Sequence, residues 1–377
     1  MNLFLRFALA LAILASGMSV LGGQREEAYK RLEAAMAQAQ QQRAQLQKKR
    51  EQALAARGRI ANDQSEVKAA RRDLGNSAAA PQIDYSRYNR CPNGEPWDNC
   101  NHVEHKQEWL PGMAAGDLIG CFGLTEPDFG SDPAGMRTNA KRDGGDWLLN
   151  GTKMWITNGS VADVAVVWAQ TDEGIRGFVV PTNTPGFSAP VIKSKLSLRA
   201  SVTSELVLEN VRLPADAVFP DVRGLKGPLS ALSEARFGIV WGVVGAARDC
   251  LETAISYAQD REQFGKPIAA FQLTQKKLAD MALELDKAFL LALHLGRLKD
   301  DHRVKPEMIS VGKLNNVREA IEIARTSRTI LGGNGITLEY PVLRHANNLE
   351  SVLTYEGTEE IHTLVVGQAL TGEAAYR

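Results

Sequence analysis

The sequence lacks an excess of charge of either sign and is poor in cysteine. Its 377 residues include 44 Lys and Arg against 44 Asp and Glu, so the overall charge gives no indication of nucleic-acid binding. Of its four cysteines, only Cys91 and Cys100 are close in sequence. Four cysteines are too few for a disulfide-stabilised scaffold. They also show no ligand spacing with the six histidines, so no metal site is expected.

The first 22 residues contain almost no charge. Arg6 is followed by an apolar run from Phe7 to Leu21. This pattern predicts a signal peptide or a short signal anchor over residues 1–22, and it leaves membrane association through residues 3–22 open. A buried helix of a globular domain is the alternative interpretation.

The next segment lacks proline and has few large apolar residues. Residues 23–75 are rich in Ala, Gln, Glu, Lys and Arg, which predicts a solvated helical rod or a weak coiled coil. With the apolar leader, this composition loosely resembles phage lysis accessory proteins of the spanin type. Residues 76–103 have the composition of a linker. Whether Cys91 and Cys100 form a disulfide stays open.

The pattern changes near residue 104. Short alternating apolar runs predict an antiparallel β domain over residues 104–225, and long amphipathic stretches predict a helical bundle over residues 226–377. The predicted fold class is therefore α+β. The apolar runs are 163–170, 177–181 and 204–213, and the amphipathic stretches are 229–261, 271–300, 306–331 and one from Thr358 onward.

Two motifs in the β domain combine small residues, hydroxyls and an aromatic side chain. The first runs from Cys121 to Asp132 (CFGLTEPDFGSD), and the second runs from Lys153 to Asn158 (KMWITN). Small residues let backbone N–H groups approach a ligand closely. Taken alone, the first motif is only a polar loop, and the Trp of the second is ordinary core packing.

Three further motifs lie in the helical part. Asp260 to Pro267 (DREQFGKP) is followed by Gln272, and its Arg has the fork geometry that binds phosphate. Thr329 to Gly335 (TILGGNG) contains a glycine turn that also suits a helix C-cap. Thr354 to Thr358 (TYEGT) places a single Glu in a polar loop, where a surface position is the usual interpretation.

In this order, the five motifs resemble the acyl-CoA dehydrogenase family. Tyr355 and the run from Arg344 to Leu349 are most similar to glutaryl-CoA dehydrogenases. The resemblance implies an FAD-dependent enzyme that converts glutaryl-CoA to crotonyl-CoA and CO2. It also implies that electrons leave through electron-transferring flavoprotein, and that the protein is a homo-oligomer, either a dimer or a tetramer.

The resemblance also implies roles for individual residues. Glu356 corresponds to the catalytic base, which an apolar, closed site would favour by raising its pKa. The implied substrate contacts are Ser131, Arg236, Tyr355 and Gly357. The implied FAD contacts are Phe122, Gly123, Leu124, Thr125, Glu126, Gly130, Ser131, Trp155, Ile156, Thr157, Arg261, Gln272, Leu331, Gly332, Gly333 and Thr358.

The chain departs from the family before residue 104. Family members begin with a further helical domain, and nothing in residues 1–101 resembles it, so we expect that domain and its carboxylate-binding residues to be missing and the dehydrogenase activity to be impaired. The dehydrogenase part is expected in the cytoplasm, whereas the leader indicates membrane or export. An alternative function follows: a membrane-anchored helical accessory segment fused to a non-catalytic dehydrogenase remnant.

Overall fold

The computed structural model describes residues 103–375. From Glu104 onward these residues belong to one compact unit. The leader predicted over residues 1–22, the polar rod over 23–75 and the linker with Cys91 and Cys100 lie outside the described residues. Within the described range, no helix is both long and apolar enough to cross a membrane.

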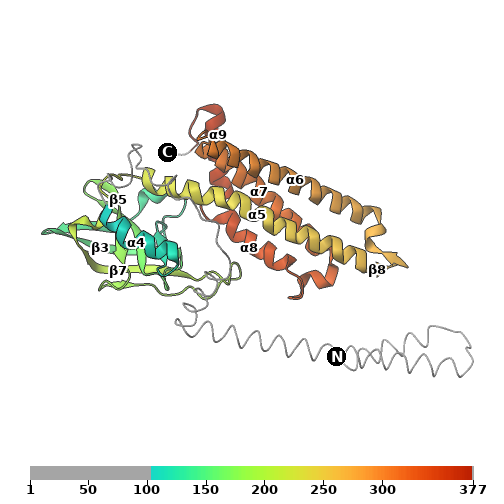
Figure 1. The fold of residues 1–377 in the computed structure, drawn as a ribbon, viewed down its shortest axis with the longest axis horizontal. Helices are drawn as coiled ribbons and strands as arrows, with labels where there is room; N and C mark the ends of the chain where they lie inside the picture. The colour runs from blue at the N-terminus through green and yellow to red at the C-terminus, as the bar shows by residue number, and fades with distance from the viewer. Residues whose placement is uncertain (1–102, 376–377) are drawn as a thin grey trace, which may run out of the picture. The chain divides into compact units, whose positions relative to one another are not determined.

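A seven-stranded sheet occupies the first half of the described chain (Figure 1). The strand order is β1-β4-β2-β3-β7-β6, and β5 also pairs with β4. Helix α4 (Val103–Ala115) precedes the sheet. The strands are β1 (Gly120–Gly123), β2 (Asn139–Asp143), β3 (Asp146–Thr157), β4 (Val164–Thr171), β5 (Gly174–Pro181), β6 (Phe187–Ser188) and β7 (Thr203–Leu213).

The prediction of an antiparallel β domain is confirmed only in part. The β2–β3 and β4–β5 pairs are antiparallel hairpins, as expected. However, β1 pairs with β4 in parallel, and Asn139 of β2 pairs in parallel with Gln170 of β4. Parallel strands need a long connection, and the β2–β3 hairpin provides it between β1 and β4. The sheet is therefore mixed.

The sheet is held together by a continuous apolar core. Leu149, Phe178 and Leu206 have no exposed surface, and Trp147 packs edge-on against Phe178 with ring centroids 5.3 Å apart. Alternate residues at the start of β3 are buried, which is the period-2 pattern that predicts a half-buried strand.

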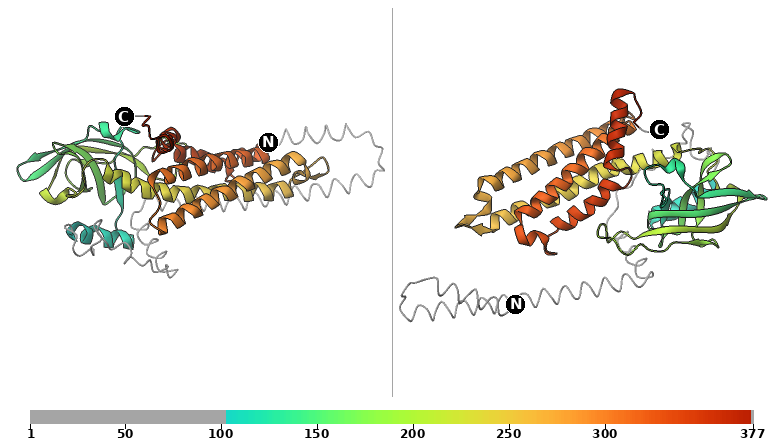
Figure 2. Two further views of the ribbon diagram at one scale, coloured as in Figure 1. Left: turned by 90° about the horizontal axis from the view of Figure 1, so that it is seen from above. Right: turned by 180° about the vertical axis from the view of Figure 1, so that it is seen from behind.

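Five helices form the C-terminal part (Figures 1 and 2). A short β8–β9 hairpin (Glu262–Gln263 and Lys266–Pro267) links the first two. The helices are α5 (Lys226–Asp260), α6 (Gln272–Asp300), α7 (Pro306–Ile330), α8 (Val342–Thr354) and α9 (Glu359–Thr371).

The sequence predicted four helices here, so α8 corrects that prediction. Val342, Ala346, Leu349 and Val352 are its buried residues, and their spacing is that of one helical face. The helix is short, and polar residues separate its apolar ones. The amphipathic pattern was therefore too brief to stand out.

Helix α7 packs against α5, α6, α8 and α9. Its buried face includes Ile309, Val317 and Ala324, but also the polar residues Lys313 and Asn316. The Asn316 amide donates 3.0 Å hydrogen bonds to the carbonyl oxygens of Val240 and Ala288 and so ties three helices together. Buried polar groups of this kind need partners, and the partners of Lys313 lie at the candidate active site.

The sheet and the helices are joined by hydrogen bonds between the loop before β7 and α8. Asn348 Oδ1 accepts from the backbone N–H of Leu198 at 2.8 Å, and Ser351 Oγ donates to Ser197 Oγ at 2.6 Å. Trp168 and Ile175 of the sheet belong to an apolar cluster that also contains Leu232 of α5. These contacts place one end of α8 beside the sheet.

Candidate active site

The loop between α8 and α9 carries Glu356 in an unusual backbone conformation. Its φ is 54° and that of Gly357 is 93°, so two successive residues occupy the left-handed region. Tyr355 caps the end of α8. Thr358 begins α9 as its N-cap, and its hydroxyl accepts a hydrogen bond from Ile361 N–H at 3.3 Å. Both neighbouring helices thus fix the ends of this tight loop.

Three basic side chains converge on the backbone of this loop. Lys313 Nζ donates to the carbonyl oxygens of Tyr355 and Gly357, each at 2.6 Å. Arg236 Nε donates to the Glu356 carbonyl oxygen at 2.7 Å, and His362 Nε2 lies 3.2 Å from the same oxygen. Side chains of α5, α7 and α9 therefore fix the three successive carbonyl groups of residues 355–357.

The carboxyl group of Glu356 is left without a strong partner. Its Oε2 is buried and has no hydrogen-bond partner among residues 103–375. Burial raises the pKa of Glu356, although the charges of Lys313 and Arg236 oppose the shift. A buried carboxylate with a raised pKa and a free lone pair is suited to accept a proton.

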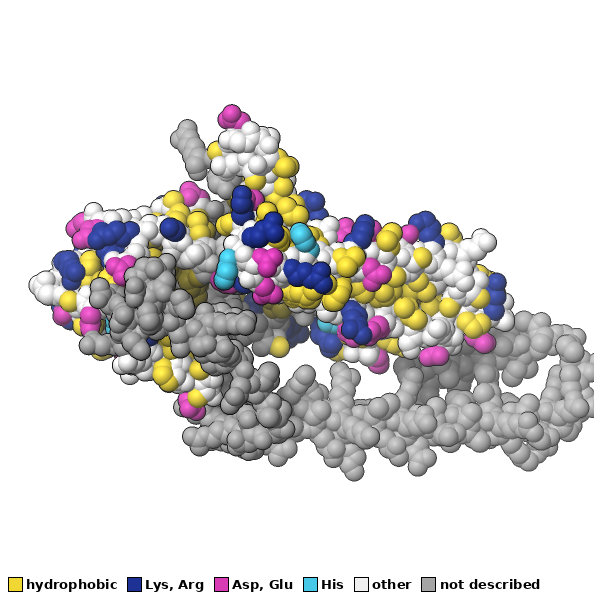
Figure 3. Space-filling model, turned by 45° about the horizontal axis from the view of Figure 1, so that its top comes forward, with side chains coloured by type: hydrophobic (Ala, Val, Ile, Leu, Met, Phe, Trp, Pro, Cys, Tyr) yellow, Lys and Arg dark blue, Asp and Glu magenta, His cyan; other side chains and the backbone are white. Residues whose placement is uncertain are grey.

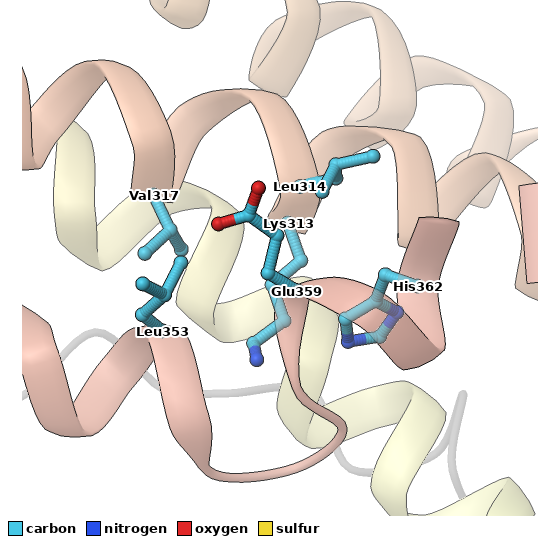
Figure 4. A pocket seen from close by; sticks show the side chains of 6 residues that line it. All are labelled: Lys313, Leu314, Val317, Leu353, Glu359 and His362. Carbon is cyan, nitrogen blue, oxygen red and sulfur yellow. The ribbon is translucent and has the colours of Figure 1, made fainter. Parts of the chain in front are cut away.

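Sequence reasoning did not identify Lys313 or His362 as site residues. Burial lowers the pKa of Lys313 to about 8. Burial, and then the charges of Lys313 and Arg236, lower the pKa of His362 to about 4. Both side chains point toward the loop and border a small cavity of about 10 Å³ (Figure 4). One signal was present, because Lys313 interrupts the apolar stripe of α7 between Ile309 and Val317.

An apolar cavity of about 190 Å³ adjoins Tyr355. Its walls come from α5, α8 and the loop at Leu198. Polar groups at its border are few, and they include His345, whose Nε2 lies 2.7 Å from Asp249 Oδ2. The lining residues are Leu198, Ile239, Gly242, Val243, Ala246, His345, Asn348, Leu349, Val352 and Tyr355.

In the sheet, a buried ion pair joins the two β-domain motifs. Lys153 Nζ lies 2.8 Å from Glu126 Oε1, and the two side chains are 0% and 5% exposed. Glu126 also accepts backbone hydrogen bonds from Arg137 and Thr138 at 2.7 and 3.0 Å. Burial opposes ionisation of Glu126, but the hydrogen bonds from Lys153, Thr138 and Arg137 lower its pKa overall. The pair therefore clamps the first motif onto β3.

The predicted cofactor contacts of the sheet divide by burial. The side chains of Leu124 and Ile156 lie in apolar clusters, and that of Glu126 is used by the ion pair. These three can meet a ligand only through backbone atoms. Gly130, Ser131 and Thr157 are exposed, and Phe122 and Thr125 are partly buried, whereas Gly123 is buried.

Trp155 is the exception among large side chains of this strand, because it is 57% exposed. A register shift between Lys153 and Ile156 interrupts the pairing with β7, and Trp155 has a φ of 63°. Met154 N–H donates to Thr125 O at 2.8 Å, so the first motif lies beside this point. The exposed indole, next to hydroxyls and open backbone, fits a planar heteroaromatic group.

Thr358 lies in the Glu356 loop, but the remaining predicted cofactor residues lie far from Glu356. Arg236 is near the start of α5 and Arg261 is its C-cap, and this stretch spans about 37 Å at a rise of about 1.5 Å per residue. Tyr257 accepts a hydrogen bond from Asn334 at 2.9 Å, which brings the Leu331–Gly333 turn to the same end of the bundle. Gln272 opens α6 there, and Leu331 itself is buried.

The structure therefore brings the predicted residues together in three places: the Glu356 loop, the sheet surface and the far end of the bundle. Within the described range, no group of three or more His, Cys, Asp or Glu side chains is arranged to hold a metal ion.

Comparisons with known proteins match two stretches of the chain. Residues 121–211 match the acyl-CoA dehydrogenase middle domain, and residues 222–371 match the acyl-CoA dehydrogenase C-terminal domain. The human mitochondrial short-chain specific acyl-CoA dehydrogenase is 40% identical over 269 residues, which are 70% of this chain but only 65% of the human protein.

A solved structure of glutaryl-CoA dehydrogenase from Mycobacterium smegmatis is more similar. It is 73% identical, with a TM-score of 0.72, over 73% of this chain and 71% of that one. A second structure of a glutaryl-CoA dehydrogenase from that organism, in complex with FADH2, is 72% identical with the same TM-score and coverage.

Proposed function

The chain belongs to the acyl-CoA dehydrogenase family, and we propose that it is an FAD-dependent dehydrogenase of acyl-CoA thioesters, with Glu356 as the catalytic base. The unpartnered, buried carboxyl oxygen of Glu356 carries the proposal. FAD, when bound, supplies the acceptor for the hydride from the substrate β-carbon. Glu356 takes the α-proton, and the burial that raises its pKa also limits competition from water.

Residues of the sheet are proposed to hold the flavin ring. Trp155 offers an exposed aromatic face, and the Lys153–Glu126 ion pair keeps the Phe122–Ser131 segment beside it. Thr157 and Ser131 provide exposed hydroxyls. The apolar cavity is lined by Tyr355, the residue before the proposed base, and suits an acyl chain.

Arg261, Gln272 and the Leu331–Gly333 turn are proposed to bind the cofactor of a second copy of the chain. They lie too far along the bundle to reach a ligand held at Glu356 in the same chain. Hydrophobic side chains gather over the helical part (Figure 3), and those of α6 include Leu283, Phe289 and Leu290, which are about half exposed or more. Such a surface favours association.

Glutaryl-CoA is the proposed substrate, because identity to a glutaryl-CoA dehydrogenase reaches 73%. The distal carboxyl group would then leave as CO2, and crotonyl-CoA would be the product. Electron-transferring flavoprotein is the proposed electron acceptor. Short-chain acyl-CoA thioesters are the second candidate substrates, supported by the 40% identity to the human short-chain enzyme.

Anaerobic titration of the purified, FAD-loaded chain tests this function. Glutaryl-CoA should bleach the flavin absorbance, and butyryl-CoA should do so more slowly. Failure to retain FAD, or retention without bleaching by either thioester, would refute the proposed dehydrogenase. Faster bleaching by butyryl-CoA would keep the enzyme class but replace the substrate.

The shared cofactor site has its own test. Arg261→Ala should weaken FAD retention by about ten- to hundredfold, because charge-assisted hydrogen bonds to phosphate are lost. The loss should grow on dilution as copies dissociate. Arg248→Ala is the matched control, since Arg248 is exposed on the same helix and its guanidinium group pairs with Glu252. Equal FAD retention in both variants would contradict the two-copy site.

A further inference from the structure

Lys313 is a fully enclosed cation whose hydrogen bonds go to the loop that carries Glu356. The side chain is 2% exposed, and its ammonium donates to Tyr355 O and Gly357 O at 2.6 Å each. These two carbonyl groups flank Glu356 on either side. One side chain of α7 therefore bridges the residue before the proposed base and the residue after it.

The bridged segment needs such support. A non-glycine residue is less stable in the left-handed region than in the right-handed one, and strained backbone persists only where the surroundings over-determine it. Glu356 has a φ of 54° and is followed by Gly357 at 93°. Lys313 fixes the direction of the carbonyl groups at both ends of this reversal, and Arg236 fixes the one between them.

We propose that Lys313 is a positioning residue that holds the Glu356 loop in its left-handed conformation and thereby directs the Glu356 carboxyl group at the substrate α-carbon. This inference rests on the proposed role of Glu356. Lys313 does not touch the reacting atoms in this assignment. It acts through the backbone of residues 355–357.

The choice of partners explains why a lysine is useful here. Lys313 binds carbonyl oxygens, so Glu356 Oε2 keeps no hydrogen-bond partner within the described chain. A direct ion pair would instead have lowered the pKa of the base and occupied its lone pairs. The charged and titratable groups around Lys313 are Glu356, Arg236, Tyr355, His362 and Glu359, and its pKa of about 8 leaves it protonated at neutral pH.

Hydrogen–deuterium exchange of the full chain tests the clamp without any turnover. Lys313→Met keeps the side-chain volume but removes both donated bonds, and exchange in residues 354–358 should rise at least about tenfold. Lys313→Gln retains one donor group and should give a smaller rise. The second variant also keeps the test valid if the first one folds poorly.

Asn316→Leu is the matched control on the same helix. Asn316 is also buried and also donates to two carbonyl groups, but those belong to α5 and α6 rather than to the loop. The control should loosen the helices without a selective effect on residues 354–358. Unchanged loop exchange in Lys313→Met, or an equal rise in the control, would overturn the proposal.

A kinetic comparison checks that Lys313 acts through Glu356. Lys313→Met should lower the rate of flavin reduction by about 10²-fold, the effect of misplacing a reacting group by about 1 Å, with little change in KM. Added to Glu356→Gln, it should lower the remaining rate no further, and independent, additive losses would contradict the proposal. If Glu356→Gln alone retains turnover, the proposed base is wrong, while the exchange measurement still decides whether the clamp exists.

Discussion

Two buried lysines, one in the sheet and one in the bundle, hold the two halves of the candidate site in different ways. Lys153 binds the carboxylate of Glu126 directly, and that carboxylate accepts hydrogen bonds from two further backbone N–H groups. Lys313 binds only carbonyl oxygens and leaves the nearby Glu356 carboxyl group with an unpartnered oxygen. Burial lowers the pKa of each lysine to about 8.

The difference separates a structural carboxylate from a reactive one. Glu126 has a lowered pKa, and both of its carboxylate oxygens accept hydrogen bonds within the chain, which shapes the first motif. Glu356 has a raised pKa and an open oxygen, so it is able to take a proton. In both places a lysine ammonium group thus stabilises a loop. Whether that ammonium group binds a carboxylate or only carbonyl oxygens decides whether the nearby carboxylate remains available for chemistry.

The largest expected effect concerns stability in the sheet. Lys153→Met leaves Glu126 buried without a cation and should cost about 3–5 kcal/mol in the free energy of unfolding. Lys313→Met should cost less, about 1–3 kcal/mol, because it removes hydrogen bonds to carbonyl groups and Glu356 can take up a proton. Urea unfolding at neutral pH, followed by circular dichroism, measures both.

A compensating change sharpens this comparison. Lys153→Met combined with Glu126→Gln removes the uncompensated charge and should recover part of the lost stability. Equal losses for Lys153→Met and Lys313→Met, or no recovery in the double variant, would break the distinction between the two clamps.

The two halves should also differ in their response to acid. His362 is 1% exposed and has a folded pKa of about 4, below an unfolded value of about 6.5. As the pH falls, the histidine takes up its proton in the unfolded chain before it does so in the folded chain. The contribution of neutral His362 to the free energy of unfolding is therefore complete above about pH 6.5 and is lost toward pH 4. The loss amounts to about 3 kcal/mol.

His362→Gln should remove this pH dependence, which unfolding free energies at several values between pH 6.5 and 4 would reveal as a difference from the natural chain. The Glu126 pair should respond only at lower pH, since its folded pKa lies below the ordinary value. Parallel pH profiles for the natural chain and His362→Gln would show that His362 is not held neutral by the fold.

A smaller effect is expected from crowding at the loop. Gly357→Ala would place a methyl group 2.9 Å from His362 Nε2 at a φ of 93°, and it should destabilise the chain by about 1–3 kcal/mol. Gly367→Ala in α9 is the control, because among the described residues no atom beyond its own helix backbone and chain neighbours lies within 4 Å of the added Cβ. It should be neutral or stabilising by up to about 1 kcal/mol. Thermal unfolding distinguishes the two, and similar melting temperatures would contradict the tight loop.

Much of the fold followed from short-range patterns. The alternation in β4, β5 and β7 predicted strands, and the long apolar stripes predicted α5, α6 and α7 because these periods extend over several turns. The parallel β1–β4 pair was missed because its pairing depends on a connection that no local pattern encodes. Trp155 looked like a core residue, and only the register shift beside it turns the indole outward.

The site was predictable only in part. Glu356 stands alone in a polar loop, so its role came from the resemblance to a family and not from spacing. Lys313 lies 42 residues from Tyr355, and its contact with that residue depends on how α7 packs beside α8. His362 likewise meets Ser310 and the Glu356 carbonyl group only in the folded bundle. Such contacts are tertiary, and composition or periodicity does not reveal them.

The most direct measurement compares flavin reduction by glutaryl-CoA in the natural chain and in Glu356→Gln, with equal FAD content confirmed by absorbance. Gln has nearly the same shape but accepts no proton, so the rate should fall by about 10²–10⁴-fold or more. Glu126→Gln offers the contrasting variant, because its carboxylate is proposed to act in structure alone and its loss should appear mainly as reduced stability. A natural chain that reduces its flavin, together with a Glu356→Gln variant that does so at a comparable rate, would contradict the assignment of Glu356 as the base.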